Sequence, residues 1–202
     1  MNIMRKSSFG ENNDLWLEKK LAKLRFNKIS AQLKAVRPLE QIADLGSGYY
    51  GQALLEAVIL FPSLVNAVGV DLSVDEKAGN PKIKLITADL NNALPLENDA
   101  FDAVVSTAVI EHLREPELII KETHRILKPG GSFLLTTPSR LNKKIVEFLA
   151  FKLGWLDQTE IADHKNYFTA AELKSLLVRA GFKNIKIKFF QFGLNILAVC
   201  QK

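Results

Sequence analysis

A glycine-rich turn with an acid just before it is the first place where this sequence suggests chemistry. Residues 41–45 read as a strand that ends in Asp44, and Gly46, Ser47 and Gly48 follow at once. Glycines let the backbone turn sharply and let a ligand approach the N–H groups that open the next helix. The Asp44 carboxylate would repel a pyrophosphate and attract a cation. The turn therefore favours a cofactor with a cationic amino group or sulfonium over a dinucleotide.

Two further acids follow predicted strands. Asp71, with Leu72 after it, ends the second strand, and Asp89, with Leu90 after it, ends the third. Carboxyl ends of parallel strands meet at one edge of an open α/β sheet, where ligands bind. Asp71 can accept both ribose hydroxyl protons, while Asp89 can accept from an adenine amine and Leu90 can offer its N–H to the ring. Each acid alone could equally be a turn or N-cap residue.

The elements that must position these residues alternate along the chain. Expected strands are 41–45, 65–70, 82–87, 101–106, 132–137, 185–190 and 194–200, and expected helices are 14–35, 52–60, 116–127, 143–153 and 170–180. Asp14 can cap the first helix and Pro38 follows its end. The alternation predicts a Rossmann-like, doubly wound α/β sheet with helices on both faces. Only three residues separate the last two strands, which indicates an antiparallel hairpin.

In this order, the segments DLGSGYYG, VGVDLS, ADLNNALPLENDAFDAVVS, AVIEHL, ILKPGGSFLLTTPS and HKNYFTAAELKSLLVRAGF resemble the methyltransferase type-11 family of class I S-adenosylmethionine-dependent methyltransferases, especially its ubiquinone- and menaquinone-biosynthesis-like members. The resemblance covers residue 41 to the C-terminus. It implies a seven-stranded sheet with the last strand antiparallel. It also implies S-adenosyl-L-methionine as cofactor, with the methionine portion at Asp44, Gly46, Ser47 and Gly48, the ribose at Asp71 and Leu72, the adenine at Asp89 and Leu90, and Ser106 nearby.

Two departures from the family pattern stand out. Tyr50 occupies the third glycine position, and Gly51 comes one residue later. Three roles stay open for Tyr49 and Tyr50: they reshape the turn, contact the methionine carboxylate, or pack on the N-terminal helix. The segment 72–81 is too short, and too rich in Gly, Asn and Pro, for the usual second helix.

Methyl transfer from a sulfonium mainly requires positioning, with a base where the acceptor is a hydroxyl or protonated amine. The candidate bases are His112, after the fourth strand, and His164, before the last helix; each could instead be structural. His124 lies inside a predicted helix and is expected to pack. No Asp/Asn cluster resembles a catechol-type metal site, so no metal is expected.

The acceptor class is narrowed by two motifs of other methyltransferases that this sequence lacks. Residues 106–109 lack the Asn/Asp-Pro-Pro-aromatic motif of nucleic-acid amino-methylating enzymes, and no acidic pair typical of arginine methyltransferases follows that strand. The net charge of +5 is spread along the chain, so no nucleic-acid partner is expected. A small-molecule acceptor remains. The alternatives are a methyltransferase-like protein that binds without turnover, or an NAD-binding oxidoreductase.

We expect an N-terminal helical extension (1–38) and a methyltransferase domain (39–202) with a lid-like insertion at 139–167. The insertion carries an apolar face of Ile145, Val146, Phe148, Leu149, Leu153, Trp155 and Leu156, with Lys143, Lys144 and Lys152 elsewhere. It could wall an apolar acceptor, make peripheral membrane contact through 141–156, or pack on the sheet edge or a second subunit of a homodimer. The only cysteine, Cys200, fits packing and a cytoplasmic location.

Overall fold

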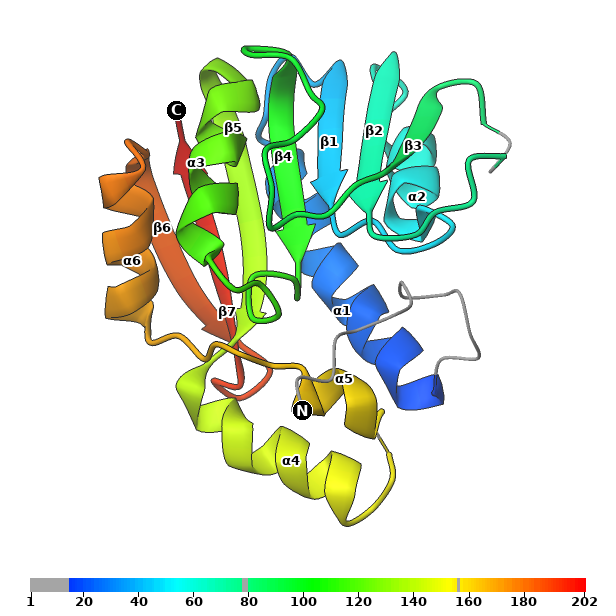
Figure 1. The fold of residues 1–202 in the computed structure, drawn as a ribbon. Helices are drawn as coiled ribbons and strands as arrows, with labels where there is room; N and C mark the ends of the chain where they lie inside the picture. The colour runs from blue at the N-terminus through cyan, green and yellow to red at the C-terminus, as the bar shows by residue number, and fades with distance from the viewer. Residues whose placement is uncertain (1–14, 78–79, 156) are drawn as a thin grey trace.

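The computed structural model describes residues 15–77, 80–155 and 157–202, and in it a seven-stranded sheet forms the centre of the chain (Figure 1). The strand order is β3-β2-β1-β4-β5-β7-β6. The strands are β1 (Gln41–Leu45), β2 (Asn66–Asp71), β3 (Ile83–Thr87), β4 (Phe101–Thr107), β5 (Leu127–Pro138), β6 (Lys183–Phe190) and β7 (Asn195–Gln201). Strands β1 to β5 pair in parallel, and β7 pairs antiparallel with both β5 and β6. This confirms the predicted fold class and the C-terminal hairpin.

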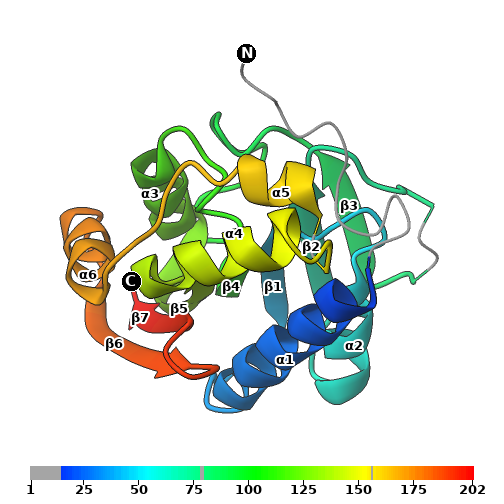
Figure 2. The same ribbon diagram turned by 90° about the horizontal axis from the view of Figure 1, so that it is seen from below.

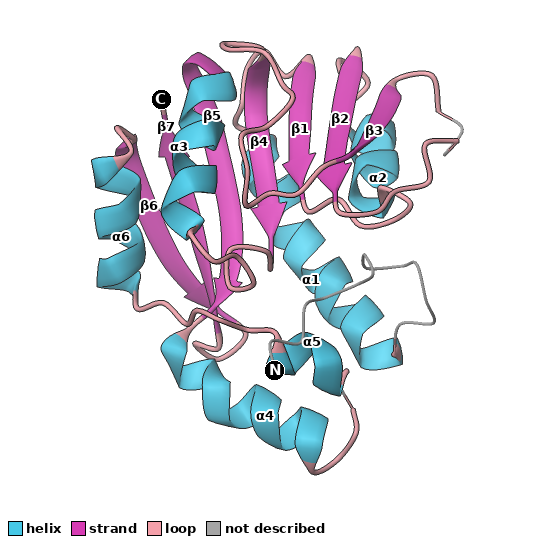
Figure 3. Cartoon of the chain, in the orientation of Figure 1, coloured by secondary structure: helices cyan, strands magenta, loops and turns pink. Residues whose placement is uncertain are grey.

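Helices cover both faces of the sheet (Figures 1 and 3). The helices are α1 (Trp16–Leu33), α2 (Gln52–Leu60), α3 (Pro116–Ile126), α4 (Lys143–Phe151), α5 (Gln158–Ala162) and α6 (Ala170–Arg179). On one face Ile29 and Leu33 of α1 pack with Leu54 of α2. On the other, Ile120 of α3 packs with Leu173 of α6. The apolar strands are therefore buried from both sides, as their near-continuous hydrophobic sequences predict.

The element boundaries match the sequence-based expectation closely, with two differences. Strand β5 begins at Leu127, five residues before the expected start, because this segment pairs with Phe101 before the register shifts. The short helix α5 was not foreseen. Between β2 and β3 the described residues form no helix, as expected for 72–81. The expected cap Asp14 lies outside the described residues.

Helices α4 and α5 lie across the carboxyl ends of β1 and β4 (Figures 1 and 2). Helix α4 is attached to α1: Ala150 is fully buried, against Leu17 and Leu21 of α1. The Glu18 carboxylate also accepts a 2.7 Å hydrogen bond from the Asp157 backbone N–H. The segment 139–167 thus lies at the same edge of the sheet as the three predicted acids. Whether 1–38 and 39–202 are separate units stays a prediction.

Candidate functional site

The turn after β1 is tight because its glycines adopt left-handed backbone conformations. Gly46 has φ +87° and Gly48 has φ +73°. The Gly46 N–H donates a 2.8 Å hydrogen bond to the Val70 carbonyl at the end of β2. A Cβ at Gly46 would lie 2.1 Å from Cγ2 of Val109, in the loop after β4. No side chain fits at this point of contact between the two loops.

Asp71 connects the second strand to this turn. Its Oδ2 accepts a 2.8 Å hydrogen bond from the Gly48 N–H, and its Oδ1 accepts a 2.7 Å bond from the Leu72 N–H. Asp71 therefore holds the turn in shape from the end of β2.

Asp44 is the most perturbed acid at this edge. It is 2% exposed, and its Oδ1 has no hydrogen-bond partner within the described residues. It borders a narrow apolar pocket whose lining includes Ile29 of α1 and Leu54 of α2. Burial, and next the nearby charge of Asp71, raise the pKa of Asp44 to about 7. A buried acceptor without a donor is suited to a cationic ligand group, so the residues here fit S-adenosyl-L-methionine.

The remaining predicted cofactor residues lie around the same edge. Asp89 is exposed after β3, and its Oδ1 accepts hydrogen bonds from the Asn91 backbone N–H (2.9 Å) and side-chain amide (2.8 Å). Leu90 is 5% exposed and packs in the core. Ser47 and Ser106 are buried, while Leu72 is 44% exposed. Asp89 is thus oriented by its own loop, with its carboxylate at the surface.

The unusual tyrosines lie at the start of α2. Gly51 is the N-cap of this helix and has a left-handed backbone conformation, with φ +59°. The third glycine of the turn therefore lies one residue later here than in the family pattern. Tyr49 and Tyr50 contact each other edge to face, with ring centroids 4.9 Å apart. Tyr50 is 48% exposed. The choice between a turn-shaping and a packing role for this pair stays open.

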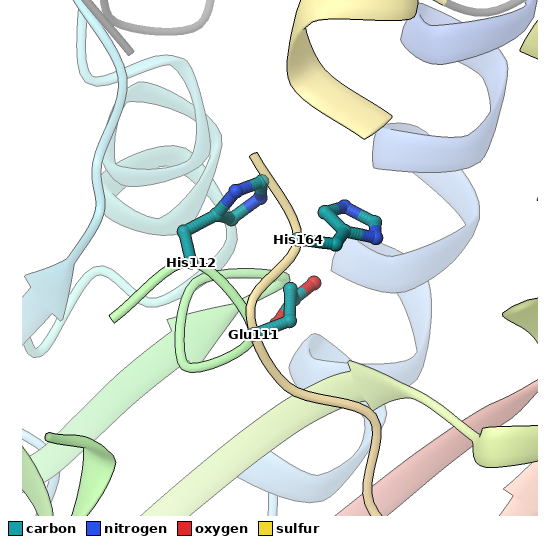
Figure 4. A group of neighbouring side chains, drawn as sticks. All are labelled: Glu111, His112 and His164. Atoms are coloured by element: carbon teal, nitrogen blue, oxygen red, sulfur yellow. The ribbon is translucent and has the colours of Figure 1, made fainter. Parts of the chain in front are cut away.

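A second cluster brings together side chains that are distant in sequence (Figure 4). The rings of His112, after β4, and His164, after α5, contact edge to face with centroids 4.6 Å apart. Glu111 joins them: it is 1% exposed and accepts a 3.0 Å hydrogen bond from the Thr137 hydroxyl. Burial raises the pKa of the Glu111 carboxyl. The two histidines predicted as candidate bases therefore share one site.

Several members of this cluster were not predicted. Asp163 Oδ2 lies 3.3 Å from His112 Nδ1, and Asp163 Oδ1 accepts a 3.0 Å hydrogen bond from Lys165 Nζ. Although burial opposes the charge, His112 and Lys165 hold the pKa of Asp163 below its ordinary value. The Tyr167 hydroxyl lies 2.9 Å from His164 Nδ1. The only available signal was that an acid directly precedes each histidine, at Glu111 and at Asp163.

Lys165 also ties the two segments together. Its Nζ donates a 2.6 Å hydrogen bond to the His112 carbonyl, and its backbone N–H donates a 2.7 Å bond to the Glu111 carbonyl. Asn166 adds a 2.7 Å bond to the Leu113 carbonyl. The loop after β4 is thus held by the end of the lid-like segment. His124, by contrast, packs edge to face on Phe182 away from this cluster, in line with its expected packing role.

Comparison with known proteins decides the family. A family model described as a methyltransferase domain matches residues 19–187. The chain belongs to this family. The methyltransferase fold, the glycine turn and the order of the strands all agree with membership of the class I S-adenosylmethionine-dependent methyltransferases, which the sequence resemblance predicted.

Curated relatives share part of their length with this chain. A probable S-adenosylmethionine-dependent methyltransferase of Mycolicibacterium smegmatis is 36% identical over 53% of this chain and 38% of its own. A ubiquinone biosynthesis O-methyltransferase of Parvibaculum lavamentivorans is 26% identical over 74% of this chain and 62% of its own. The chain thus spans 27–62% of the length of the first three curated relatives it matches.

Solved structures support the fold. A SAM-dependent methyltransferase from Archaeoglobus fulgidus superposes with a TM-score of 0.69, at 16% identity, over 92% of this chain and 98% of that one. A Haemonchus contortus phosphoethanolamine N-methyltransferase in complex with S-adenosyl-L-methionine has a TM-score of 0.67, at 17% identity, over 87% of this chain and 52% of that one. No helix among the described residues is long and apolar enough to cross a membrane.

Proposed function

We propose that this chain transfers the methyl group of S-adenosyl-L-methionine to a small organic acceptor. The observation that carries the proposal is Asp44, a buried carboxylate whose Oδ1 has no hydrogen-bond partner within the described residues. It lies beside a glycine turn in which Gly46 has no room for a side chain. A cationic sulfonium cofactor complements such a site, whereas the pyrophosphate of a dinucleotide opposes it. We therefore disfavour the NAD-binding alternative.

In this proposal the cofactor lies along the carboxyl ends of β1, β2 and β3. The methionine portion faces Asp44 and the turn of Gly46, Ser47 and Gly48, and the ribose hydroxyls face Asp71 and Leu72. Asp89 and Leu90 recognise the adenine, and Ser106 lies nearby at the end of β4. Bound cofactor supplies the activated methyl group. The protein contributes orientation of donor and acceptor and exclusion of water, which together account for much of the rate in such displacements.

The acceptor side lies between the loop after β4 and the segment 139–167. His112 and His164 are the candidate general bases there, and their shared position supports a role in removing an acceptor proton.

The deciding experiment is a screen of quinol, phenol and amine acceptors that measures release of S-adenosylhomocysteine. Release with one acceptor class supports transfer if, at limiting cofactor, it is reduced in Asp71→Ala and kept in the exposed control Glu76→Ala. Cofactor binding without release in any screen would favour the alternative of a binding protein without turnover.

We further propose that the outer face of α4 contacts an anionic lipid surface that supplies an apolar acceptor. The large apolar side chains exposed here are Leu141 (75%), Ile145 (42%), Phe148 (55%), Phe151 (49%), Leu153 (42%) and Trp155 (51%). Lys143 and Lys152 beside them are exposed and cationic. An apolar stripe flanked by lysines is typical of helices that lie in the membrane interface. The side chains of Lys144 and Val146, and Leu156, which the prediction included, lie outside the described part of the chain.

Vesicle co-sedimentation tests this lipid contact. The protein should sediment with phosphatidylserine-containing vesicles and less with neutral ones, because Lys143 and Lys152 add electrostatic attraction. Replacing Phe148 and Trp155 with Ser should abolish sedimentation, while Val178→Ser, at an equally exposed apolar residue on α6, should not. Absence of vesicle binding together with a concentration-dependent dimer in light scattering would instead assign the face to a second copy of the chain.

A further inference from the structure

The cluster around His112 and His164 has the composition of a metal site. One donor atom from each of Glu111, His112 and His164 lies within 4.8 Å of the other two (Figure 4). We propose that these three side chains bind one first-row divalent transition-metal ion, such as Zn²⁺. The sequence alone led us to expect no metal, because it has no Asp/Asn cluster of the catechol type. The three ligands proposed here come from two segments about 50 residues apart.

His112 is the strongest indication that this cluster binds an ion. It is 8% exposed, and neither of its ring nitrogens has a hydrogen bond of acceptable geometry within the described residues. Its Nδ1 is only near Asp163, at 3.3 Å from Oδ2. Leaving a buried polar group unpaired is unfavourable, so an imidazole in this state is suited to a partner that is not part of the chain. Neutral histidine is the commonest metal ligand in proteins, so a metal ion is a suitable partner.

The surroundings resemble the outer sphere of a metal site. Asp163 lies beside Nδ1 of His112, and the Tyr167 hydroxyl lies 2.9 Å from Nδ1 of His164. The Thr137 hydroxyl donates to Glu111 Oε2 at 3.0 Å. Metal-binding histidines usually pair one ring nitrogen with a carboxylate or another oxygen and coordinate through the other. Each proposed ligand therefore has the supporting oxygen that orients it.

The ligand types decide which ions fit. Two imidazoles and one carboxylate suit Zn²⁺, Co²⁺ or Fe²⁺ and leave coordination positions open, whereas Mg²⁺ prefers oxygen ligands alone. Ligands about 2.0–2.1 Å from a tetrahedral ion lie about 3.4 Å apart. The donor atoms, now within 4.8 Å, must close in on the ion by side-chain rotation. Lys165, paired with Asp163, and Arg25, whose charge partly offsets the rise that burial causes in the pKa of Glu111, are cations near the site and oppose ion binding.

The role of the ion rests on the proposed methyl transfer, but its binding does not. An open coordination position on the acceptor side would take a hydroxyl or phenol oxygen of the substrate and favour its ionised form. His112 and His164 would then serve as ligands and not as bases.

Cobalt titration of the full chain tests the site directly. Co²⁺ should give visible absorption bands that saturate at one ion per chain, and Zn²⁺ should remove them, while millimolar Mg²⁺ should not. His164→Ala and Glu111→Gln should each weaken Co²⁺ binding 10- to 100-fold or more, in line with loss of a ligand. His124→Ala is the matched control, because it removes the remaining histidine of the chain and should leave the titration unchanged.

The outcomes separate this inference from the proposed function. Thermal unfolding of each variant identifies loss of fold, and His164→Gln repeats the test with a side chain of similar size. Absence of saturable Co²⁺ bands in the folded wild-type chain, or equal titration of wild type, His164→Gln and Glu111→Gln, would overturn the metal site. Cofactor binding is measured separately, by calorimetry with S-adenosyl-L-methionine. The metal site can therefore fail while the methyltransferase proposal stands, and the methyltransferase proposal can fail while the metal site stands.

Discussion

The two sides of the sheet edge are built in different ways. On the proposed cofactor side, Asp44, Asp71 and Asp89 lie at or just after the carboxyl ends of three adjacent strands, and short hydrogen bonds such as Gly48 N–H to Asp71 set the turn. On the proposed acceptor side, His112 and His164 come from separate loops that Lys165 and Asn166 join through side-chain hydrogen bonds. The cofactor side is therefore encoded by local motifs, whereas the acceptor side depends on tertiary packing of the lid-like segment.

The largest effect expected from this comparison is at Gly46. Gly46→Ala introduces a Cβ at φ +87° and 2.1 Å from Val109, so it strains the backbone and displaces the loop after β4. Left-handed strain and overpacking together predict a loss of about 2–5 kcal/mol in the free energy of unfolding, with loss of cofactor binding.

Gly154→Ala, in the lid-like segment, is the matched control for this change. Gly154 has φ +63°, but an added Cβ would meet no atom within 4 Å. Backbone strain alone predicts a loss of about 1–2 kcal/mol and unchanged cofactor affinity. Denaturant unfolding of both variants measures the difference. Equal destabilisation by the two substitutions would show that the contact with Val109 does not constrain the turn.

The next effect is a pH dependence of cofactor binding set by Asp44. Its pKa is raised to about 7 in the free protein, so the carboxyl is largely protonated at pH 6 and ionised at pH 8. A cationic ligand favours the ionised form, so binding releases a proton and affinity rises by up to about tenfold per pH unit below pH 7, then levels off. Calorimetry at pH 6, 7 and 8 measures this slope.

Asp44→Asn is the control, since it keeps the shape of the side chain and cannot titrate. The variant should bind the cofactor more weakly at pH 8 and lose the slope between pH 6 and 7. Calorimetry in two buffers of different ionisation enthalpy should detect a released proton in wild type only. A slope that survives in Asp44→Asn would assign the titration to another group.

The smallest effect belongs to the outer face of α4. Phe148 is 55% exposed, so Phe148→Ser should change the free energy of unfolding by less than about 0.5 kcal/mol while reducing vesicle binding. The buried side of the same helix differs: Ala150 is fully buried against α1. Ala150→Leu should therefore destabilise by about 1–3 kcal/mol through overpacking. If Phe148→Ser destabilises as much as Ala150→Leu, the outer face is covered in the native protein.

The contrast between the two sides also explains what the sequence could predict. Strands β1 and β4 follow from continuous apolar runs, and the turn at Gly46 and Gly48 follows from a contiguous motif, so the fold and the shape of this turn were predictable. The pairing of His112 with Asp163 was not, because it depends on how 139–167 folds back over the sheet. No periodicity in the sequence indicates the contact between His112 and Asp163. The start of β5 at Leu127 was missed for a similar reason, since it depends on pairing with Phe101.

The account rests most directly on Asp71, which links the glycine turn to the proposed ribose site. Calorimetry of the wild-type chain should show one S-adenosyl-L-methionine or S-adenosylhomocysteine bound with micromolar affinity. Asp71→Ala should lose about 1.5–3 kcal/mol of binding free energy, because charge-assisted hydrogen bonds contribute about this much. Glu76→Ala should bind the cofactor as wild type does. Thermal unfolding shows whether the turn survives without the Asp71 bond to Gly48. No heat with either ligand, or equally tight binding by a folded Asp71→Ala variant, would contradict the assignment of this edge as the cofactor site.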